Sequence, residues 1–138
     1  MSPILGILAS SNFQRVTSSY ESIATATVGS GGSSGITFSS IPQTYTHLQI
    51  RMIARNSSSS DAVRGQFNSD TTAANYSGHL LYGDGTSAGA AAATSFGKFG
   101  AGYQAQSSTT AGTFGVSVLD ILNYTSTSKG KTTRFLGG

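Results

Sequence analysis

The sequence predicts an all-β chain, an antiparallel β-sandwich of the jelly-roll type with an extended N-terminal arm. Three observations lead to this prediction. Apolar and polar residues alternate with a period of two in several short stretches, turn-forming Gly, Ser and Asn separate these stretches, and no stretch carries a convincing helical period. About six to eight short strands separated by turns are typical of a sandwich or jelly roll.

The composition fits one folded domain. The 138 residues include 24 Ser, 17 Thr and 18 Gly, more than two fifths of the chain, which makes disorder the first alternative. Disordered chains usually stay soluble through high net charge, but only 9% of these residues are charged, against roughly 25% in an average domain. Seven Phe and six Tyr lie within the alternating segments. We therefore expect a folded chain, rich in β-structure.

The same composition disfavours several classes of function. Without Cys there is no disulfide framework, no thiolate metal site and no cysteine nucleophile. The net charge of +3 comes from dispersed cations, so we expect no nucleic-acid partner. The longest apolar run is far shorter than the roughly 20 residues of a membrane span, and the start lacks the basic region of a signal peptide. We expect no membrane partner, cofactor or metal ion.

Residues 1–19 are expected to form the arm, and residues 20–138 the sandwich domain. The apolar residues of the first stretch do not persist at either the helical or the strand period. An arm that buries them on a partner explains this pattern, and a frayed terminus is the alternative. The arm residues expected to bind the partner are Ile4, Leu5, Ile7, Leu8 and Phe13.

A hairpin is expected in residues 20–41. Ile23, Thr25 and Thr27 alternate with smaller residues up to Val28, a pattern typical of a strand. The run Gly29–Gly35 predicts a turn, and a second strand follows from residue 36 until Pro42 ends it.

The strand predicted most strongly is residues 47–56. Leu48, Ile50, Met52 and Ala54 fall on one face, and the other face is mostly polar. Shorter alternating runs predict strands at residues 63–67 and 76–82. The loops beside them are Ser69–Thr72 and Gly83–Gly85.

The second half is harder to interpret. For residues 86–112 we favour a long loop with one strand near Phe96–Tyr103, while Ala90–Ala93 would also suit the start of a helix. Residues 113–124 predict a strand with Phe114, Val116 and Val118 inward, followed by a slip in phase near Asp120 that indicates a bulge. Residues 131–136 are expected to add a last strand.

Three strings resemble a module found in virion structural proteins of tailed bacteriophages, cyanophages above all. They are ESIATATVGSGGSSGITFSSIPQTYTHLQIR (residues 21–51), NYSGHLLYGDG (75–85) and LDILNY (119–124), and the resemblance covers roughly residues 20–134. It implies a jelly-roll-like domain displayed on a phage particle. It also implies further strands after Arg134, so we expect a neighbouring chain to complete the sandwich, or the fold to close differently.

The resemblance implies a non-enzymatic capsid cement or decoration subunit. Its partners would be the major capsid protein and copies of itself, as a homo-oligomer with a trimer favoured, on the outer surface of the virion head. The alternative is a head-fibre, collar or tail-appendage module that recognises a host polysaccharide. In that case Tyr82 and Tyr103 are candidates for stacking on sugar rings.

Few other residues are candidates for a site. Lys129, Lys131 and Arg134 gather near the C-terminus and would suit an acidic capsid surface, or would simply be a solvated end. His47 and His79 are expected to be structural or surface residues. No two carboxylates are spaced as a catalytic dyad, so we expect no catalytic residues; the acids are Glu21, Asp61, Asp70, Asp84 and Asp120. Asp84 is expected to stabilise a turn.

Overall fold

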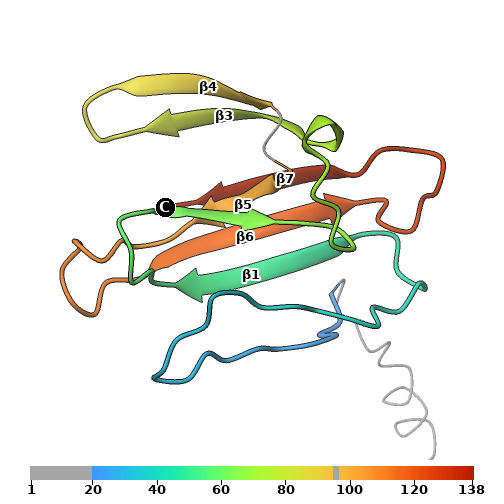
Figure 1. The fold of residues 1–138 in the computed structure, drawn as a ribbon, viewed down its shortest axis with the longest axis horizontal. Coiled ribbons are helices and arrows are strands. Elements are labelled where there is room, and N and C mark those ends of the chain that lie inside the picture. Colours follow the sequence, from blue (N-terminus) through green and yellow to red (C-terminus); the bar gives the residue numbers. More distant parts are fainter. Residues whose placement is uncertain (1–19, 95–96) are drawn as a thin grey trace, which may run out of the picture. The chain divides into compact units, whose positions relative to one another are not determined.

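The computed structural model describes residues 20–94 and 97–138 of the chain (Figure 1). They belong to two compact units, one that ends at Pro42 and one that spans Gln43–Gly138. The predicted arm, residues 1–19, lies outside the described residues. Within the described part, every regular element is a strand except one short 3-10 helix, η1 (Ala73–Asn75), and all the strand pairs are antiparallel. The prediction of an all-β fold with antiparallel sheets is confirmed.

The described part of the first unit runs out, turns and returns, without forming a ladder (Figure 1). The Gly32 N–H donates to the Gly29 carbonyl at 3.0 Å, and Gly32 has a φ of +75°, which glycine adopts without steric cost. The expected turn is therefore confirmed, but the two expected strands are wrong. The large apolar side chains are exposed, Ile23 and Ile36 among them, so burial does not stabilise what would be a marginal two-stranded hairpin.

The principal sheet of the second unit has the order β1-β6-β7 (Figure 1). Its strands are β1 (Leu48–Ala54), β6 (Gly115–Leu122) and β7 (Thr132–Gly137). β1 pairs with β6 from Leu48↔Ile121 to Ala54↔Gly115, and β7 pairs with β6 from Ser117↔Gly137 to Leu122↔Thr132. The predictions of β1, with Leu48, Ile50, Met52 and Ala54 sharing one half-buried face, and of β7 are confirmed.

Two smaller sheets complete this unit. One pairs β2 (Ala62–Gly65) with β5 (Phe99–Tyr103), and its register shifts between Val63 and Arg64. The other is a hairpin of β3 (Ser77–Gly83) and β4 (Ala88–Thr94). The sequence favours a loop or a helix start where β4 forms, because alanine has low strand propensity; pairing with β3 overrides that propensity.

The β2–β5 sheet packs against one face of the principal sheet, since β5 lies against both β6 and β7. Ser117 of β6, the most buried side chain described, joins these layers: its Oγ donates to the Tyr103 carbonyl at 2.9 Å and accepts the Tyr103 N–H at 3.0 Å. The layers approach closely at Gly102 because glycine has no Cβ. A Cβ at this position would lie only 2.4 Å from the Ser117 Oγ. The arrangement is compatible with a β-sandwich.

The core at this contact is small. Among the described residues, the buried apolar side chains are Leu119 and Ile121, 3% and 4% exposed, both on the inner face of β6. The expected bulge near Asp120 is wrong, because β6 keeps one continuous register with both neighbours. As a result Ser117 faces inward, while Phe114 and Val116, which were expected inward, are exposed. Ser117 occupies the inward position, where its hydroxyl bonds the N–H and the carbonyl of Tyr103.

Arg55 holds the loop that precedes β6. Its guanidinium donates to four backbone carbonyls, those of Ser107, Thr109, Thr110 and Thr113, at 2.6–3.2 Å. The Arg55 backbone also forms a parallel bridge with Ala105, and the Asn56 N–H donates to the Ala105 carbonyl at 2.8 Å. These bonds join the end of β1 to the chain that follows β5.

Candidate interaction surface

The outer face of the principal sheet, the face turned away from β5, presents an apolar row. Since side chains alternate along a strand, β6 points Leu119 inward and Val116 and Val118 outward. Ile53 lies opposite Val116, and Leu136 lies opposite Val118. Ile53, Val116 and Leu136 are 74%, 52% and 81% exposed. We call these three residues with Val118 the outer apolar row.

A polar group borders this row. The Asp120 carboxylate accepts a bond from Gln49 Nε2 at 2.9 Å and forms an ion pair with Arg134 at 3.0 Å. The Gln49 hydrogen bond and then the Arg134 guanidinium hold the pKa of Asp120 below its usual value. Gln49, Asp120 and Arg134 lie side by side across the three strands, because Asp120 is the register partner of both other residues. The outer face therefore combines the outer apolar row with the Asp120–Arg134 ion pair and with Arg51, which lies opposite Val118 and donates a hydrogen bond to Gln49 Oε1 at 2.7 Å.

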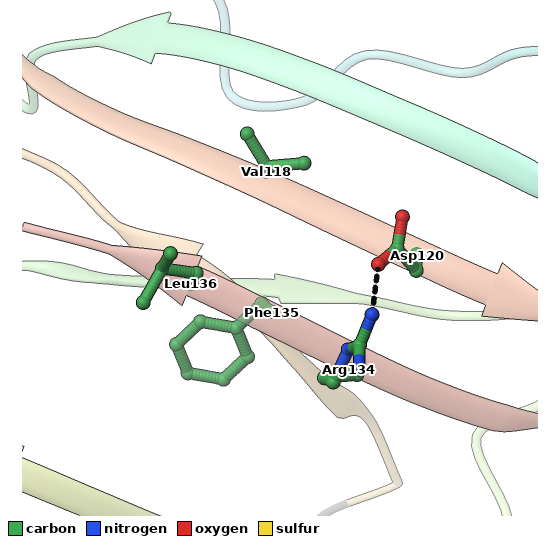
Figure 2. A pocket seen from close by; sticks show the side chains of 5 residues that line it. All are labelled: Val118, Asp120, Arg134, Phe135 and Leu136. Atoms are coloured by element: carbon green, nitrogen blue, oxygen red, sulfur yellow. Dashed lines mark hydrogen bonds and ion pairs between the residues drawn. The ribbon is translucent and has the colours of Figure 1, made fainter. Parts of the chain in front are cut away.

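An open cavity of about 440 Å³ lies where these two parts meet (Figure 2). Figure 2 shows its lining from β6 and β7, with the Asp120–Arg134 ion pair on one side and Leu136 on the other. The lining residues are Val118, Asp120, Arg134, Phe135 and Leu136. An apolar wall with a few polar groups is the usual chemistry of a contact surface.

The structure separates the three residues of the predicted basic group. Arg134 forms an ion pair with Asp120, although the arginine side chain is 80% exposed. Lys131 is half-buried, and its Nζ donates to the Ser126 carbonyl. Lys129 is exposed in the loop before β7. The predicted arm residues Ile4, Leu5, Ile7, Leu8 and Phe13 lie outside the described residues.

The two candidate tyrosines differ in accessibility. Tyr82 on β3 is 49% exposed, and its ring covers Gly89 across the hairpin, where a Cβ would lie 2.5 Å from the ring. Tyr103 is half-buried, and its ring centroid lies 5.8 Å from that of Phe135. Tyr82 is thus the better placed of the two to meet a ligand from solvent.

His47, Asp84 and Asp70 make local hydrogen bonds. His79 is exposed on β3, and His47 Nδ1 accepts the Asn123 N–H at 3.1 Å. Asp84 accepts bonds from the N–H and hydroxyl groups of Thr86 and Ser87, chiefly the Ser87 N–H, which strongly lower its pKa. The expectation that Asp84 stabilises a turn is confirmed.

Asp70 resembles Asp84 in its bonding. Its carboxylate accepts a bond from Asn75 Nδ2 at 2.7 Å and the Thr72 N–H at 2.8 Å, and its pKa is lowered, first by Asn75. Among residues 20–94 and 97–138, no three His or acidic side chains are grouped so as to hold a metal ion. No helix in the same residues is long and apolar enough to span a membrane.

Sequence reasoning missed the outer apolar row. Ile53 interrupts the polar face of β1, and this single residue was the available signal. Val116 was assigned to the inner face, and Leu136 to a terminal strand without a face. Comparisons of the chain with protein-family models, curated proteins and solved structures return no match.

Proposed function

We propose that this chain is a non-enzymatic structural subunit of a tailed-phage virion, a cement or decoration protein. It binds the outer surface of the head and links neighbouring capsid subunits. The resemblance of residues 20–134 to phage virion modules motivates the class. The observation that carries the mechanism is the outer apolar row, with Ile53, Val116 and Leu136 exposed on one face of the principal sheet.

The physical argument rests on burial. Covering a large apolar side chain completely stabilises an assembly by roughly 1.5–3 kcal/mol. Three such residues in one row therefore offset part of the cost of immobilising the subunit. Many identical sites on one particle add avidity to a weak single contact. The low charge, 9% of residues, also limits repulsion between copies packed side by side.

Three finer features belong to the same proposal. The sandwich has jelly-roll connectivity, and residues 1–19 form an arm that buries Ile4, Leu5, Ile7, Leu8 and Phe13 on the capsid or a neighbouring copy. Once assembled on the head, a trimer would match the local three-fold positions of the capsid lattice. Ordering the arm costs about 1–2 kcal/mol per residue of backbone, which burial of its apolar residues must offset.

The test measures occupancy on assembled heads that lack the protein. Ile53→Ser removes apolar area from the row, and Leu81→Ser makes the same change at a residue 85% exposed on β3. We expect Ile53→Ser to reduce occupancy and Leu81→Ser to leave it unchanged. Equal occupancy for both variants would remove the outer row from the mechanism.

A second experiment tests the arm on the same particles. Deleting residues 1–19 should lower occupancy, because the deletion removes the proposed anchor. Unchanged occupancy of the truncated chain would contradict the arm. If the full chain itself fails to bind heads, the cement proposal is wrong, whatever the variants do.

Recognition of a host polysaccharide by a fibre, collar or tail appendage is the second candidate. The observation that favours it is Tyr82, a half-exposed ring at the outer end of the β3–β4 hairpin. Such a ring stacks on the apolar face of a sugar. A glycan-array signal that is lost on Tyr82→Ala and kept on Tyr103→Phe would support it, and the absence of any signal with the wild-type chain would contradict it.

A further inference from the structure

β7 has an open edge whose hydrogen-bonding groups can be identified from the register. Val116 and Gly138 exchange two backbone bonds of 3.1 Å, so they form a hydrogen-bonded pair of the antiparallel ladder. Such pairs recur at every second residue, which makes Leu136 and Arg134 the next residues bonded to β6. The intervening residues, Thr133, Phe135 and Gly137, therefore direct their N–H and C=O groups away from β6.

In the described part of the chain, these outward groups meet no other strand. β7 is the last strand of the order β1-β6-β7, and no backbone bond outside its ladder involves Thr133, Phe135 or Gly137. Natural edge strands avoid pairing through charge, proline or bulges. β7 has no proline and one continuous register, and its single charge, Arg134, is paired with Asp120. This edge is therefore open to another strand.

We propose that two copies of this chain pair β7 with β7, antiparallel, about a two-fold axis through Phe135. In this register Phe135 lies opposite Phe135 of the second copy, and Thr133 lies opposite Gly137. Thr133 and Gly137 are equally distant from Phe135 along β7. Each residue whose backbone N–H and C=O point away from β6 therefore lies opposite a residue of the second copy whose backbone groups also point outward. Three hydrogen-bonded pairs with two bonds each then satisfy every outward group of β7.

The side chains on the outer face also fit this symmetry. Leu136 lies opposite Arg134 of the second copy, so the neighbouring strand covers one side of a leucine that is otherwise 81% exposed. The two Arg134 residues are offset along the strands and each keeps its own Asp120, so like charges do not face each other. The cavity of Figure 2 is lined by Arg134, Phe135 and Leu136, three consecutive residues of this edge, and the second strand fills it.

The absence of native cysteine makes a disulfide test direct. Arg134→Cys mixed with Leu136→Cys should give a disulfide-linked heterodimer, because these two positions face each other across the axis. Either variant alone should not cross-link, since its own two cysteines are offset by two residues and about 8 Å apart at Cα, beyond the roughly 7 Å that a disulfide spans. Thr132→Cys mixed with Leu136→Cys is the matched control, with the same offset and the same sheet face.

A second measurement removes an outward N–H without touching the bonds to β6. Thr133→Pro should raise the dimer Kd at least about tenfold in sedimentation experiments, because it removes one N–H donor from each copy. Thr133→Val keeps the N–H and should leave the Kd within about twofold. Circular dichroism shows whether each variant is folded, and if Thr133→Pro is not, the cysteine mixtures decide alone.

This inference does not depend on the proposed virion role, since it concerns the purified chain in solution. A monomer at all concentrations, a mass of three chains, or cross-linking that is equal in the mixed and single samples would each overturn it. Those results would leave binding to heads to be judged separately. Dimers that fail to bind heads would overturn only the virion role.

Discussion

The principal sheet and the β3–β4 hairpin use similar strands to very different effect. β1, β3 and β4 each have seven residues, and all pair antiparallel. The principal sheet buries Leu119 and Ile121 under β5, whereas the hairpin exposes Leu81 and Tyr82, although β3 also lies near β5. The difference is the second layer. Backbone pairing alone makes a ladder, but contact between layers makes a core.

The layer contact should be most sensitive at Gly102. Gly102→Ala places a Cβ 2.4 Å from the Ser117 Oγ, and the φ of +148° is strained for any side chain. We expect a loss of about 2–6 kcal/mol in the free energy of unfolding, measured by urea denaturation. The control is Gly130→Ala, where a Cβ meets nothing within 4 Å. Equal stability of the two variants would contradict the close approach of the layers.

The core itself is tested by a matched pair of leucines. Leu119→Ala should cost about 2–5 kcal/mol in unfolding free energy, because a buried side chain is removed. Leu81→Ala on the hairpin should change that free energy by less than about 0.5 kcal/mol, since Leu81 is already exposed. Equal losses of unfolding free energy for Leu119→Ala and Leu81→Ala would contradict the difference in burial between the principal sheet and the hairpin.

The Ser117 hydroxyl should have a smaller effect. Ser117→Ala leaves the Tyr103 N–H and carbonyl without their partner, and we expect a loss of about 1–3 kcal/mol in unfolding free energy. Ser117→Thr is a poor rescue because Gly137 also packs on this oxygen. Ser87→Ala in the hairpin turn is the exposed control. A neutral Ser117→Ala would show that the two layers hold together without these bonds.

The smallest effect is expected at the hairpin turn. The Ser87 and Thr86 bonds lower the pKa of Asp84, so its contribution to stability is present above the ordinary Asp pKa of about 3.9. As the pH falls below that value toward the lowered pKa, protonation removes the contribution. Thr86 and Ser87 amide NMR signals should therefore shift only at strongly acidic pH, and Asp84→Ala should abolish that step. A titration near pH 4 would contradict the turn bonds.

Alternation predicted the strands whose context agrees with their composition. β1 was predicted because its apolar residues recur at every second position; the last strand was expected at residues 131–136, and β7 forms at Thr132–Gly137. β4 was missed because Ala88–Thr94 has no β-branched residue except its last, and only pairing with β3 makes it a strand. The prediction of two strands at residues 20–41 was wrong although their composition favours strands. Ile23, Val28 and Ile36 are exposed in the described part of the chain, so burial does not stabilise a ladder there.

The candidate surface was predicted less well than the fold. A period of two assigns residues to two faces, but it does not say which face the second layer covers. In β6 the valines looked more suitable for the interior than a serine. The interior position went to Ser117 because the Tyr103 backbone, distant in sequence, requires a hydroxyl there. That requirement left Val116 outside and created the outer apolar row.

The Ser117 hydroxyl also limits how the two layers can slide on each other. A slide of one layer along β6 by two residues would bring Gly115 or Leu119 beneath Tyr103, and neither residue has a side chain that can accept an N–H or donate to a carbonyl. Two small sheets with few large side chains have many alignments of similar apolar area. One oxygen that bonds twice distinguishes a single alignment from all the others, so in this chain a polar atom at the centre does what bulky side chains do in larger proteins.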